Sequence, residues 1–468
     1  MCAEKIYNFD KIIDRKGTGA VKVDGLKKVF GKEDLLPLWV ADMDFETPDF
    51  IIGAMKERLD HPVFGYHTEP EDYRPSICDW VAHMHQWDIQ PDWLRYIPGI
   101  VKGIGMAINA LLKQDDKIII QPPVYHPFRL VPQKNNHEIV FNPLRELPGG
   151  GYEMDFENLE EVCDEKCKML ILANPHNPAG ITWPREALEK LASFCHKKGI
   201  IVISDEIHSD MALFGNKHIP FASVSEEAAA CSITFGAPSK TFNIAGIVSS
   251  YAIVPNDNLR KRFFDWVDAS EFGAAHIFAP IATIAAYRNG KQWREQMLKY
   301  IEGNIEFVIS YCKENIPQIR PLRPQASFLV WLDCRGTGLD HDQLIDTFIN
   351  KAGLALNDGE NGLTDHISQF CLFHGIHFFL FYCRQFREII AVLTHDLEFG
   401  RTADDGNSIF FVCFDGNCFT VQSANDFVEN SCFDCNFTHF FDFCIDGCCF
   451  DADFQIVTCH YKTFMVCC

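Results

Sequence analysis

The sequence lacks the features that mark membrane, secreted or nucleic-acid-binding proteins. No apolar run reaches the roughly 20 residues that a membrane-spanning helix needs; the nearest candidate, residues 370–383, is too short and contains two histidines. The first residues contain no apolar signal core. Lys and Arg number 42 against 64 Asp and Glu, a formal net charge of −22, whereas phosphate backbones are bound by basic surfaces. We therefore expect a cytoplasmic protein with neither a membrane nor a nucleic-acid partner.

Cysteine is sparse in most of the chain and abundant at its end. Only eight of the 20 cysteines fall in residues 1–360, where they are scattered, as expected for reduced thiols in a cytosolic enzyme. The other twelve fall in residues 361–468, which also hold 20 of the 40 Phe but no Pro, no Trp and a single Lys, Lys462. The composition therefore changes near residue 360.

Two interpretations of residues 361–468 remain open. One is an appended metal-binding or disulfide module, because Cys432–Cys435 and Cys444–Cys448, with two histidines nearby, loosely imitate zinc spacing. The other is an out-of-frame or disordered tail, since a single Cys-x2-Cys is a weak signal and so many exposed Phe would favour aggregation. We favour the tail and expect no metal site in the protein.

The preceding part of the chain alternates apolar runs with amphipathic helices. Residues 168–204 predict a strand–helix–strand unit, whose helix has Pro184 in its first turn and Gly199 as its stop. This alternation is typical of an α/β protein with a mostly parallel sheet and helices on both faces. The predicted domains are an N-terminal arm with part of a small domain (1–45), a large domain (46–290), a small α/β domain that is incomplete at the C-terminus (291–360) and the unmatched tail (361–468).

Three polar side chains each follow an apolar run that reads as a buried strand. They are Asn177, Asp205 and Lys240, after the runs at residues 169–173, 200–203 and 232–235. In open α/β sheets, ligands bind at the carboxyl ends of the strands. A pyridoxal 5'-phosphate (PLP) enzyme needs a Lys that forms the Schiff base and an Asp that keeps the ring nitrogen protonated. An Asn can donate to the ring's phenolate oxygen, so the set indicates a PLP site.

Each candidate also has an ordinary structural interpretation. A lysine is usually a solvated charge, Asp205 could cap the next turn, and Asn177 lies in a turn-like Asn-Pro-Ala-Gly. His208 could share the role of Asn177 or be structural, and Tyr125 could stack on an aromatic ring or be plain core. Glycines around Lys102 could open a helix whose N-terminus favours a phosphate. The ordered combination, more than any one residue, favours the functional interpretation.

Residues from about 30 to 358 resemble fold type I PLP enzymes of the class I/II aminotransferase superfamily, and more narrowly the MalY/PatB-type cystathionine β-lyases (C–S lyases). The motifs that carry the resemblance are Pro37-Leu-Trp-Val-Ala-Asp-Met-Asp-Phe45, Phe64–Tyr66, Pro98–Val101, Asn174–Gly180, Ser204–His208, Ser239–Gly246 and Leu356–Gly359. Typical aminotransferases of this class carry Tyr where His208 stands and Arg where Val248 stands. Both differences favour the lyase branch.

The resemblance implies roles for the catalytic and cofactor-binding residues. Lys240 would form the Schiff base and act as the base at Cα, Asp205 would pair with the pyridine nitrogen, and Tyr125 would stack on the ring. Asn177 and His208 would contact the phenolate oxygen. The phosphate would be held by Gly103, Ile104 and Ser239. Tyr66 would reach the cofactor of the partner subunit, so the active unit should be a homodimer.

The implied reaction is β-elimination of cystathionine or a related cysteine S-conjugate to a thiol, pyruvate and ammonia, with a small amino acid as substrate. Transamination shares the first steps, so an aminotransferase of the same fold remains an alternative, and a non-catalytic regulator is a third. Lyases of this branch carry a C-terminal Arg that binds the substrate carboxylate. After Gly359 this chain reads Glu-Asn-Gly-Leu-Thr-Asp-His instead. Because a bidentate Arg is hard to replace, we expect PLP binding but poor turnover.

Overall fold

The computed structural model describes residues 5–359 throughout and, after them, only the backbone of five short strands. It divides the chain into two units, Met1–Leu397 and Glu398–Cys468. The described part of the second unit consists of two antiparallel pairs, β16 (Phe410–Phe414) with β17 (Asn417–Val421) and β18 (Cys448–Phe450) with β19 (Ile456–Cys459). The side chains of the metal module considered for residues 361–468, and the rest of that tail, lie outside the described residues.

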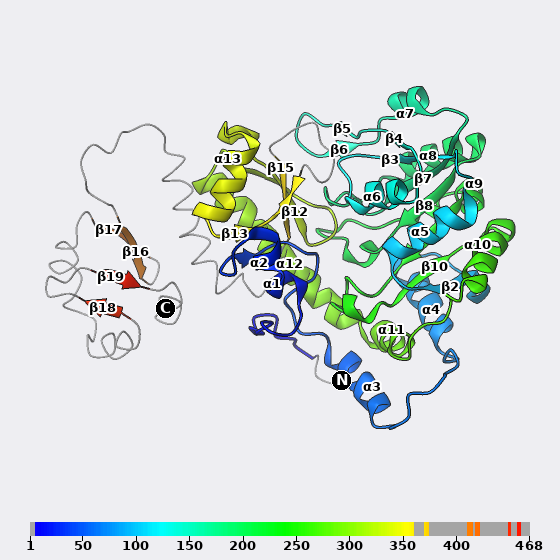
Figure 1. Ribbon diagram of the computed structural model, residues 1–468, viewed down its shortest axis with the longest axis horizontal. Helices are drawn as coiled ribbons and strands as arrows, with labels where there is room; N and C mark the ends of the chain where they lie inside the picture. The colour runs from blue at the N-terminus through cyan, green and yellow to red at the C-terminus, as the bar shows by residue number, and fades with distance from the viewer. Residues whose placement is uncertain are drawn as a thin grey trace. The chain divides into compact units, whose positions relative to one another are not determined.

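A seven-stranded sheet forms the centre of the first unit, in the order β2-β10-β9-β8-β7-β3-β4 (Figure 1). Only β10 runs antiparallel to its neighbours β2 and β9, and the other pairs are parallel. The mostly parallel α/β sheet expected from the sequence is confirmed. Its strands are β2 (Leu94–Ile97), β3 (Lys117–Ile120), β4 (Ile139–Phe141), β7 (Cys167–Ala173), β8 (Ile201–Asp205), β9 (Ser232–Gly236) and β10 (Ser250–Ile253).

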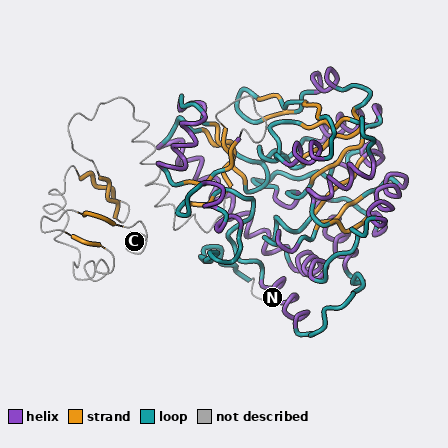
Figure 2. Tube along the Cα trace, viewed as in Figure 1, coloured by secondary structure: helices purple, strands orange, loops and turns teal. Residues whose placement is uncertain are grey.

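Alternate residues of β7 enter different hydrophobic clusters on the two faces of the sheet. Leu170 and Leu172 pack in one cluster with Leu188 of α8, whereas Met169 and Ile171 pack in the other with residues of α5 and α10. Helices therefore cover both faces, as the purple coils around the orange strands show (Figure 2). The helices of this part are α3 (Asp49–Leu59), α4 (Tyr73–His85), α5 (Ile100–Leu111), α6 (Pro127–Lys134), α7 (Phe156–Val162), α8 (Arg185–Lys198), α9 (Glu226–Cys231), α10 (Asp257–Ala269) and α11 (Phe278–Asn289).

Helix α8 begins and ends where its sequence signals predict. Pro184 precedes its first residue, and Gly199 terminates it in the left-handed region at φ 67°. The Gly199 N–H donates to the carbonyls of Cys195 and His196, which satisfies carbonyls that a helix end leaves free. Parallel strands β7 and β8 need such a crossover helix between them.

A four-stranded antiparallel sheet, in the order β11-β12-β15-β14, lies beyond the long helix α12 (Lys291–Asn315). Its strand β15 comes from residues after position 360, and the backbone of that strand pairs with both β12 and β14. The N-terminal arm joins this region because Leu36 pairs in parallel with Leu354. The elements are α1 (Val21–Asp24), α2 (Leu26–Phe30), β1 (Leu36–Pro37), β11 (Arg320–Leu322), β12 (Leu329–Asp333), α13 (His341–Asp346), β13 (Leu354–Ala355), β14 (Asn357–Asp358) and β15 (Gln369–Phe373), with the small hairpin β5 (Arg145–Glu146) and β6 (Tyr152–Glu153).

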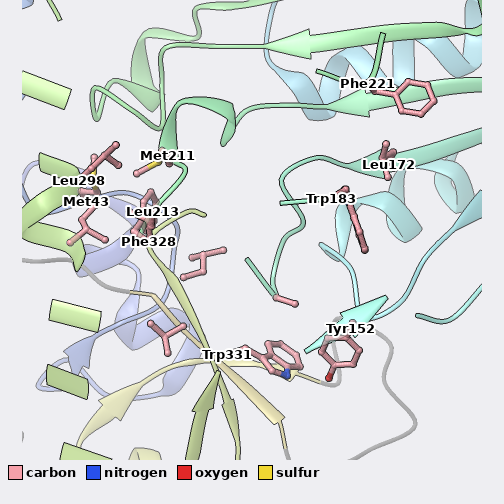
Figure 3. Packing of buried hydrophobic residues seen from close by; sticks show 14 of the residues in the cluster. Met43, Tyr152, Leu172, Trp183, Met211, Leu213, Phe221, Leu298, Phe328 and Trp331 are labelled. Carbon is pink, nitrogen blue, oxygen red and sulfur yellow. The ribbon is translucent and has the colours of Figure 1, made fainter. Parts of the chain in front are cut away.

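The hydrophobic core continues from the large sheet into the start of β12. Met211 and Leu213, which follow β8, lie near Phe328, which precedes β12 (Figure 3). All three side chains are fully buried. This contact brings the segment before β12 to the carboxyl edge of the large sheet. Within the described residues, no helix combines the length and the apolar character that crossing a bilayer requires.

Candidate active site

The turns that follow β7, β8 and β9 lie side by side at the carboxyl edge of the sheet. The Asn174 N–H donates to the Asp205 carbonyl over 2.9 Å, and the Glu206 N–H donates to the Phe235 carbonyl, also over 2.9 Å. These bonds extend the strand ladder past the ends of the strands. Asn177, Asp205 and Lys240 therefore emerge from adjacent turns, at the edge where the sequence predicts them.

Asp205 is a buried carboxylate at the last position of β8. Its Oδ1 accepts the N–H of Ile207 over 3.1 Å. Burial raises the pKa of Asp205 to about 7, although the Ile207 N–H and the charge of Lys240 act in the opposite direction. Among the described residues, no Lys, Arg or His forms an ion pair with it at 4 Å or less. The site therefore offers a carboxylate that a buried cation would stabilise.

Lys240 follows β9 in a turn of small residues. Burial lowers the pKa of its amine to about 8, while the carboxylates of Asp42 and Asp205 oppose this effect. Its Nζ donates to the carbonyl oxygen of Ala41, in the N-terminal arm. A lysine with a lowered pKa holds more of its amine in the neutral, nucleophilic form near neutral pH. Lys240 and Asp205 lie within electrostatic range of each other.

Tyr125 and Asn177 are joined through their backbones. The Tyr125 N–H donates to the Asn177 carbonyl over 3.2 Å, and both side chains are half-buried. Burial raises the pKa of Tyr125, and the charge of Asp205 adds to that effect. The aromatic ring and the amide therefore lie on loops that are fixed next to the buried carboxylate.

His208 is buried three residues after Asp205. Burial, with a smaller effect of the Lys240 charge, lowers the pKa of His208 to about 3, so its ring is neutral. Its Nδ1 lies 3.1 Å from Oγ of Ser327. Its Nε2 is buried and, within the part of the chain that the structure describes, has no hydrogen-bond partner.

The phosphate residues implied by the resemblance fall partly inside helix α5. The Gly103 N–H already donates to the Gly99 carbonyl over 2.8 Å, and Ile104 is fully buried one residue further on. A side chain at Gly103 would meet Ile97 Cδ1 at 2.6 Å, so this glycine serves the packing of α5 on β2. The amides left without helical partners belong to the first turn, residues 100–102.

Ser239 and Tyr66 lie in very different surroundings. Ser239 is buried directly before Lys240, whereas the side chain of Tyr66 is fully exposed, at 110% of its reference area. The described part of this chain gives Tyr66 no place at the site. A role for it needs a second chain.

Asn243 ties the lysine loop to the N-terminal arm, a role that sequence reasoning missed. Its Oδ1 accepts the Met43 N–H over 3.0 Å, and its Nδ2 donates to the carbonyls of Met43 and Phe45, each over 2.8 Å. Thr47 Oγ1 donates to the Asn243 carbonyl over 3.2 Å. The signal available in the sequence was the position of Asn243, three residues after Lys240 within the motif Ser239–Gly246.

A group of charges holds the same arm beside Lys240. Arg15 donates to Asp42 Oδ2 over 2.8 Å and to Asp44 Oδ1 over 2.7 Å. The amine of Lys22, which has no exposed surface, donates to Asp44 Oδ2 over 2.9 Å. Buried charges are stable only when paired and hydrogen-bonded. This network fixes Asp42 near the amine of Lys240.

Comparison with known families gives one match that covers most of the chain. The model of the family "Aminotransferase class I and II" matches residues 33–363. Of the residues described around this candidate site, the matched range contains all except Arg15 and Lys22. Within the described residues, no group of three or more His, Cys, Asp or Glu could hold a metal ion.

Individual proteins and structures agree with this match. The chain is 42% identical to cystathionine beta-lyase PatB of Bacillus subtilis (strain 168) over 353 residues, which cover 75% of this chain and 91% of that protein. It is 30% identical to protein MalY of Escherichia coli (strain K12), over 76% of this chain and 90% of that protein. The structure of cystalysin from Treponema denticola, which contains a pyridoxal 5'-phosphate cofactor, is similar with a TM-score of 0.79 and 31% identity, covering 84% of this chain and 99% of that one.

Proposed function

This chain belongs to the aminotransferase class I and II family, and we propose that it cleaves the carbon–sulfur bond of cystathionine or a related cysteine S-conjugate. The products are a thiol, pyruvate and ammonia. The carrying observation is that two buried groups at the same sheet edge influence each other electrostatically: Lys240, whose pKa burial lowers to about 8, and Asp205, whose pKa burial raises to about 7. Pairs of groups whose pKa values are displaced by burial are characteristic of catalytic sites.

The residues present fit PLP, the cofactor of this family. Lys240 would hold its aldehyde carbon, Asp205 its protonated ring nitrogen, and Tyr125 its ring face. Asn177 and His208 would bind its ring oxygen, and the unpartnered Nε2 of His208 supports this assignment. PLP, when bound, withdraws electrons from the bonds at the substrate's Cα.

The phosphate of PLP requires hydrogen-bond donors that have no other partner in the chain. We assign it to the free amides in the first turn of α5, residues 100–102, because the Gly103 amide already donates to Gly99. An anion is favoured at a helix N-terminus, where amides point outward. The buried Ser239 adds a hydroxyl from the Lys240 side of the site.

Lys240 is the base that removes the Cα proton. Its lowered pKa keeps a neutral amine available near pH 8, which suits proton transfer at the operating pH. The Ala41 carbonyl, which accepts a hydrogen bond from Lys240 Nζ, orients the amine. Asp205 would stay ionised beside the protonated ring nitrogen of bound PLP, and would stabilise that positive charge.

The active unit that we propose is a homodimer in the cytoplasm. Val63, Phe64 and Tyr66 expose 61%, 54% and 110% of their reference areas on one loop between α3 and α4. Exposed apolar clusters of this kind mark interaction surfaces. Tyr66 would then reach the cofactor of the second copy.

The proposal is tested by incubating the purified full-length chain with PLP and cystathionine, and measuring pyruvate. Lys240→Ala is the control, because it removes both the covalent anchor and the base. Pyruvate from the unaltered chain and none from Lys240→Ala is the expected result. Glutamate formed from 2-oxoglutarate without pyruvate would favour the aminotransferase alternative.

The rate in this assay also tests the expectation of poor turnover. The C-terminal segment in which the family carries its carboxylate-binding Arg lies outside the described residues. We expect the KM for cystathionine to be high, because an Arg–carboxylate pair is hard to replace. Rapid turnover with a low KM would contradict that expectation.

A further inference from the structure

His208, in the turn after β8, packs against two residues that precede β12, Ser327 and Phe328. Its ring lies 5.9 Å from that of Phe328, at an interplanar angle of 69°. Its Nδ1 contacts the Ser327 hydroxyl, and its Nε2 is left without a partner in the described structure. Both Ser327 and His208 are almost completely buried, with 1% and 2% exposed. The pair therefore joins the large sheet to the segment that leads into β12.

That segment, residues 324–328, is held against the site by backbone hydrogen bonds. The N–H groups of Gln325 and Ala326 both donate to the Gly180 carbonyl, over 2.7 and 3.0 Å. Gly180 ends the loop that carries Asn177. The position of the segment is therefore fixed relative to the loop that faces the cofactor's ring oxygen.

A second set of bonds fixes the segment to the loop of His208. The Ser327 N–H donates to the Met211 carbonyl and the Leu213 N–H donates to the Gln325 carbonyl, each over 2.8 Å. The apolar side chains of Met211, Leu213 and Phe328 gather at this junction (Figure 3). The backbone of Ser327 is thus held in place independently of His208.

Ser327 has a backbone conformation that favours glycine. Its φ is +74°, a region that costs a residue with a Cβ of the order of 1–2 kcal/mol. Residues kept in such conformations cluster at functional sites, where the surrounding structure overdetermines them. A glycine here would relieve the strain but remove the hydroxyl, so the hydroxyl is the feature that a serine adds.

Counting protons assigns the direction of the Ser327–His208 bond. The neutral ring carries one N–H, and the serine carries one O–H whose only hydrogen-bond partner in the described structure is Nδ1. If Nδ1 donated to Oγ, the serine proton would be buried without an acceptor, which is costly. If Oγ donates to Nδ1, the serine proton is satisfied and the ring proton is on Nε2, where an acceptor on the bound cofactor would satisfy it.

We propose that Ser327 is a positioning residue that holds His208 in the tautomer with its proton on Nε2, so that His208 donates a hydrogen bond to the ring oxygen of the bound cofactor. The inference rests on the proposed function only for the identity of the acceptor. The tautomer depends on Ser327 together with an acceptor at Nε2, because without that acceptor each tautomer leaves one buried proton unsatisfied. Through this bond, the segment before β12 influences the charge on the cofactor's ring.

The tautomer is measured by ¹⁵N NMR of the full-length chain labelled at its histidine rings, with and without PLP. The His208 resonances are assigned by their loss in His208→Gln. In the PLP-loaded chain the expected result is a bare acceptor shift at Nδ1 and a protonated shift at Nε2 at pH 7, with Ser327→Ala averaging the two. A protonated Nδ1 in the PLP-loaded unaltered chain, or no change in Ser327→Ala, overturns the proposal whether or not the chain is a lyase.

The effect on the cofactor is measured by titrating the visible absorption of the PLP-loaded chain with pH. A donor at the ring oxygen stabilises its anionic form, so Ser327→Ala is expected to raise the midpoint by about 0.5–1 pH unit, the size of one lost hydrogen bond. An unchanged midpoint overturns the assignment of the ring oxygen as the acceptor. Absence of any visible band in the unaltered chain counts instead against the proposed function.

Three further variants separate the hydroxyl from folding effects. Ser327→Gly relieves the φ of +74° and is expected to shift the midpoint as Ser327→Ala does. Ser232→Ala is the matched control, because its buried hydroxyl donates to the Ala228 carbonyl over 2.6 Å, away from His208, and it should leave the midpoint unchanged. In a His208→Gln background, Ser327→Ala should add no further shift, and an additive shift would show that Ser327 acts by another route.

Discussion

The two sides of the active site are built from different kinds of contact. On one side, Asn177, Asp205 and Lys240 follow the neighbouring strands β7, β8 and β9, so the backbone ladder of the sheet delivers them together. On the other side lie the arm at residues 40–45 and the segment at residues 324–328. These come from distant parts of the chain and are attached by individual hydrogen bonds, such as those of Asn243 to the arm, 200 residues away in sequence.

The difference indicates a division of roles in the site, in which the strand ends carry the chemical groups and the attached segments orient them. The strand ends supply the groups for which we propose reactive roles, because parallel strands bring their carboxyl ends to one edge. The two attached segments contact Lys240 and His208 through the Ala41 carbonyl and the Ser327 hydroxyl, and we propose that these contacts orient the two side chains. Damage to the first side should remove catalysis with little loss of stability, whereas damage to the second should change stability and substrate handling together.

The largest effect is expected from Asp205→Asn. The amide keeps the shape of the side chain but cannot stabilise a buried cation, so kcat should fall by about 10²–10³-fold, as for other preorganised electrostatic groups. The measurement is pyruvate formation with saturating PLP and cystathionine. A loss of less than about fivefold would mean that Asp205 does not contact the positively charged ring nitrogen, as its proposed role requires.

The same variant should also flatten the pH dependence of stability of the cofactor-free chain. Because burial raises the pKa of Asp205 from 3.8 to about 7, the folded state binds more protons than the unfolded state between these values. Its contribution to the free energy of unfolding is therefore fully present below about pH 4 and is lost as the pH rises to 7. Urea unfolding at pH 5, 6 and 7 should show this decline in the unaltered chain and a smaller one in Asp205→Asn.

Gly180→Ala should disturb the close contact between the loop that carries Asn177 and the segment at residues 324–328. The added Cβ would lie 2.5 Å from Pro324 Cβ and 2.9 Å from the Ala326 carbonyl, at a φ of +65°. We expect a loss of at least about 2 kcal/mol in the free energy of unfolding, since both strain and steric overlap oppose the fold. Thermal or urea unfolding checks this, with Gly246→Ala, where nothing lies within 4 Å of the added Cβ, as the matched control.

Asn243→Ala removes three side-chain hydrogen bonds that anchor the arm. At about 0.5–1.5 kcal/mol for each bond, we expect a loss of about 2–3 kcal/mol in unfolding free energy, together with a raised KM. Asn243→Asp keeps the acceptor for the Met43 N–H but not the two donors, so it should fall between. If the unfolding free energy of Asn243→Ala equals that of the unaltered chain and only kcat falls, the anchoring role of Asn243 is wrong.

Gln325→Ala is expected to have the smallest effect. Its exposed side chain accepts bonds from Thr182 N and Thr182 Oγ1 over 3.0 and 3.2 Å, while the backbone bonds of the segment to Gly180 remain. Exposed contacts of this kind are worth within about 0.5 kcal/mol. Unfolding and KM measurements should both stay close to those of the unaltered chain, and a large change would mean that side chains, more than the backbone, hold the segment.

Much of this protein was determined by its sequence alone. The apolar runs and the stop at Gly199 define the strands and helix α8, and their alternation yields the mostly parallel sheet with helices on both faces. The placement of Asn177, Asp205 and Lys240 at one edge follows from that topology, because Asp205 ends its strand and the other two lie in the turns after theirs. The motifs around them carried the resemblance to the family.

Other features were decided only by the tertiary structure. The residue at which α5 begins decides which amides are free, so residues 100–102 replace Gly103 and Ile104 as the candidate phosphate donors. The partners of Asn243 and Ser327 lie 200 and 119 residues away in sequence, and no local pattern of polarity encodes a hydrogen bond across such a distance. Strand ends can be read from the chain because their position follows from short-range hydrophobic patterning, whereas these anchors exist only once the folded backbone has brought the two segments together.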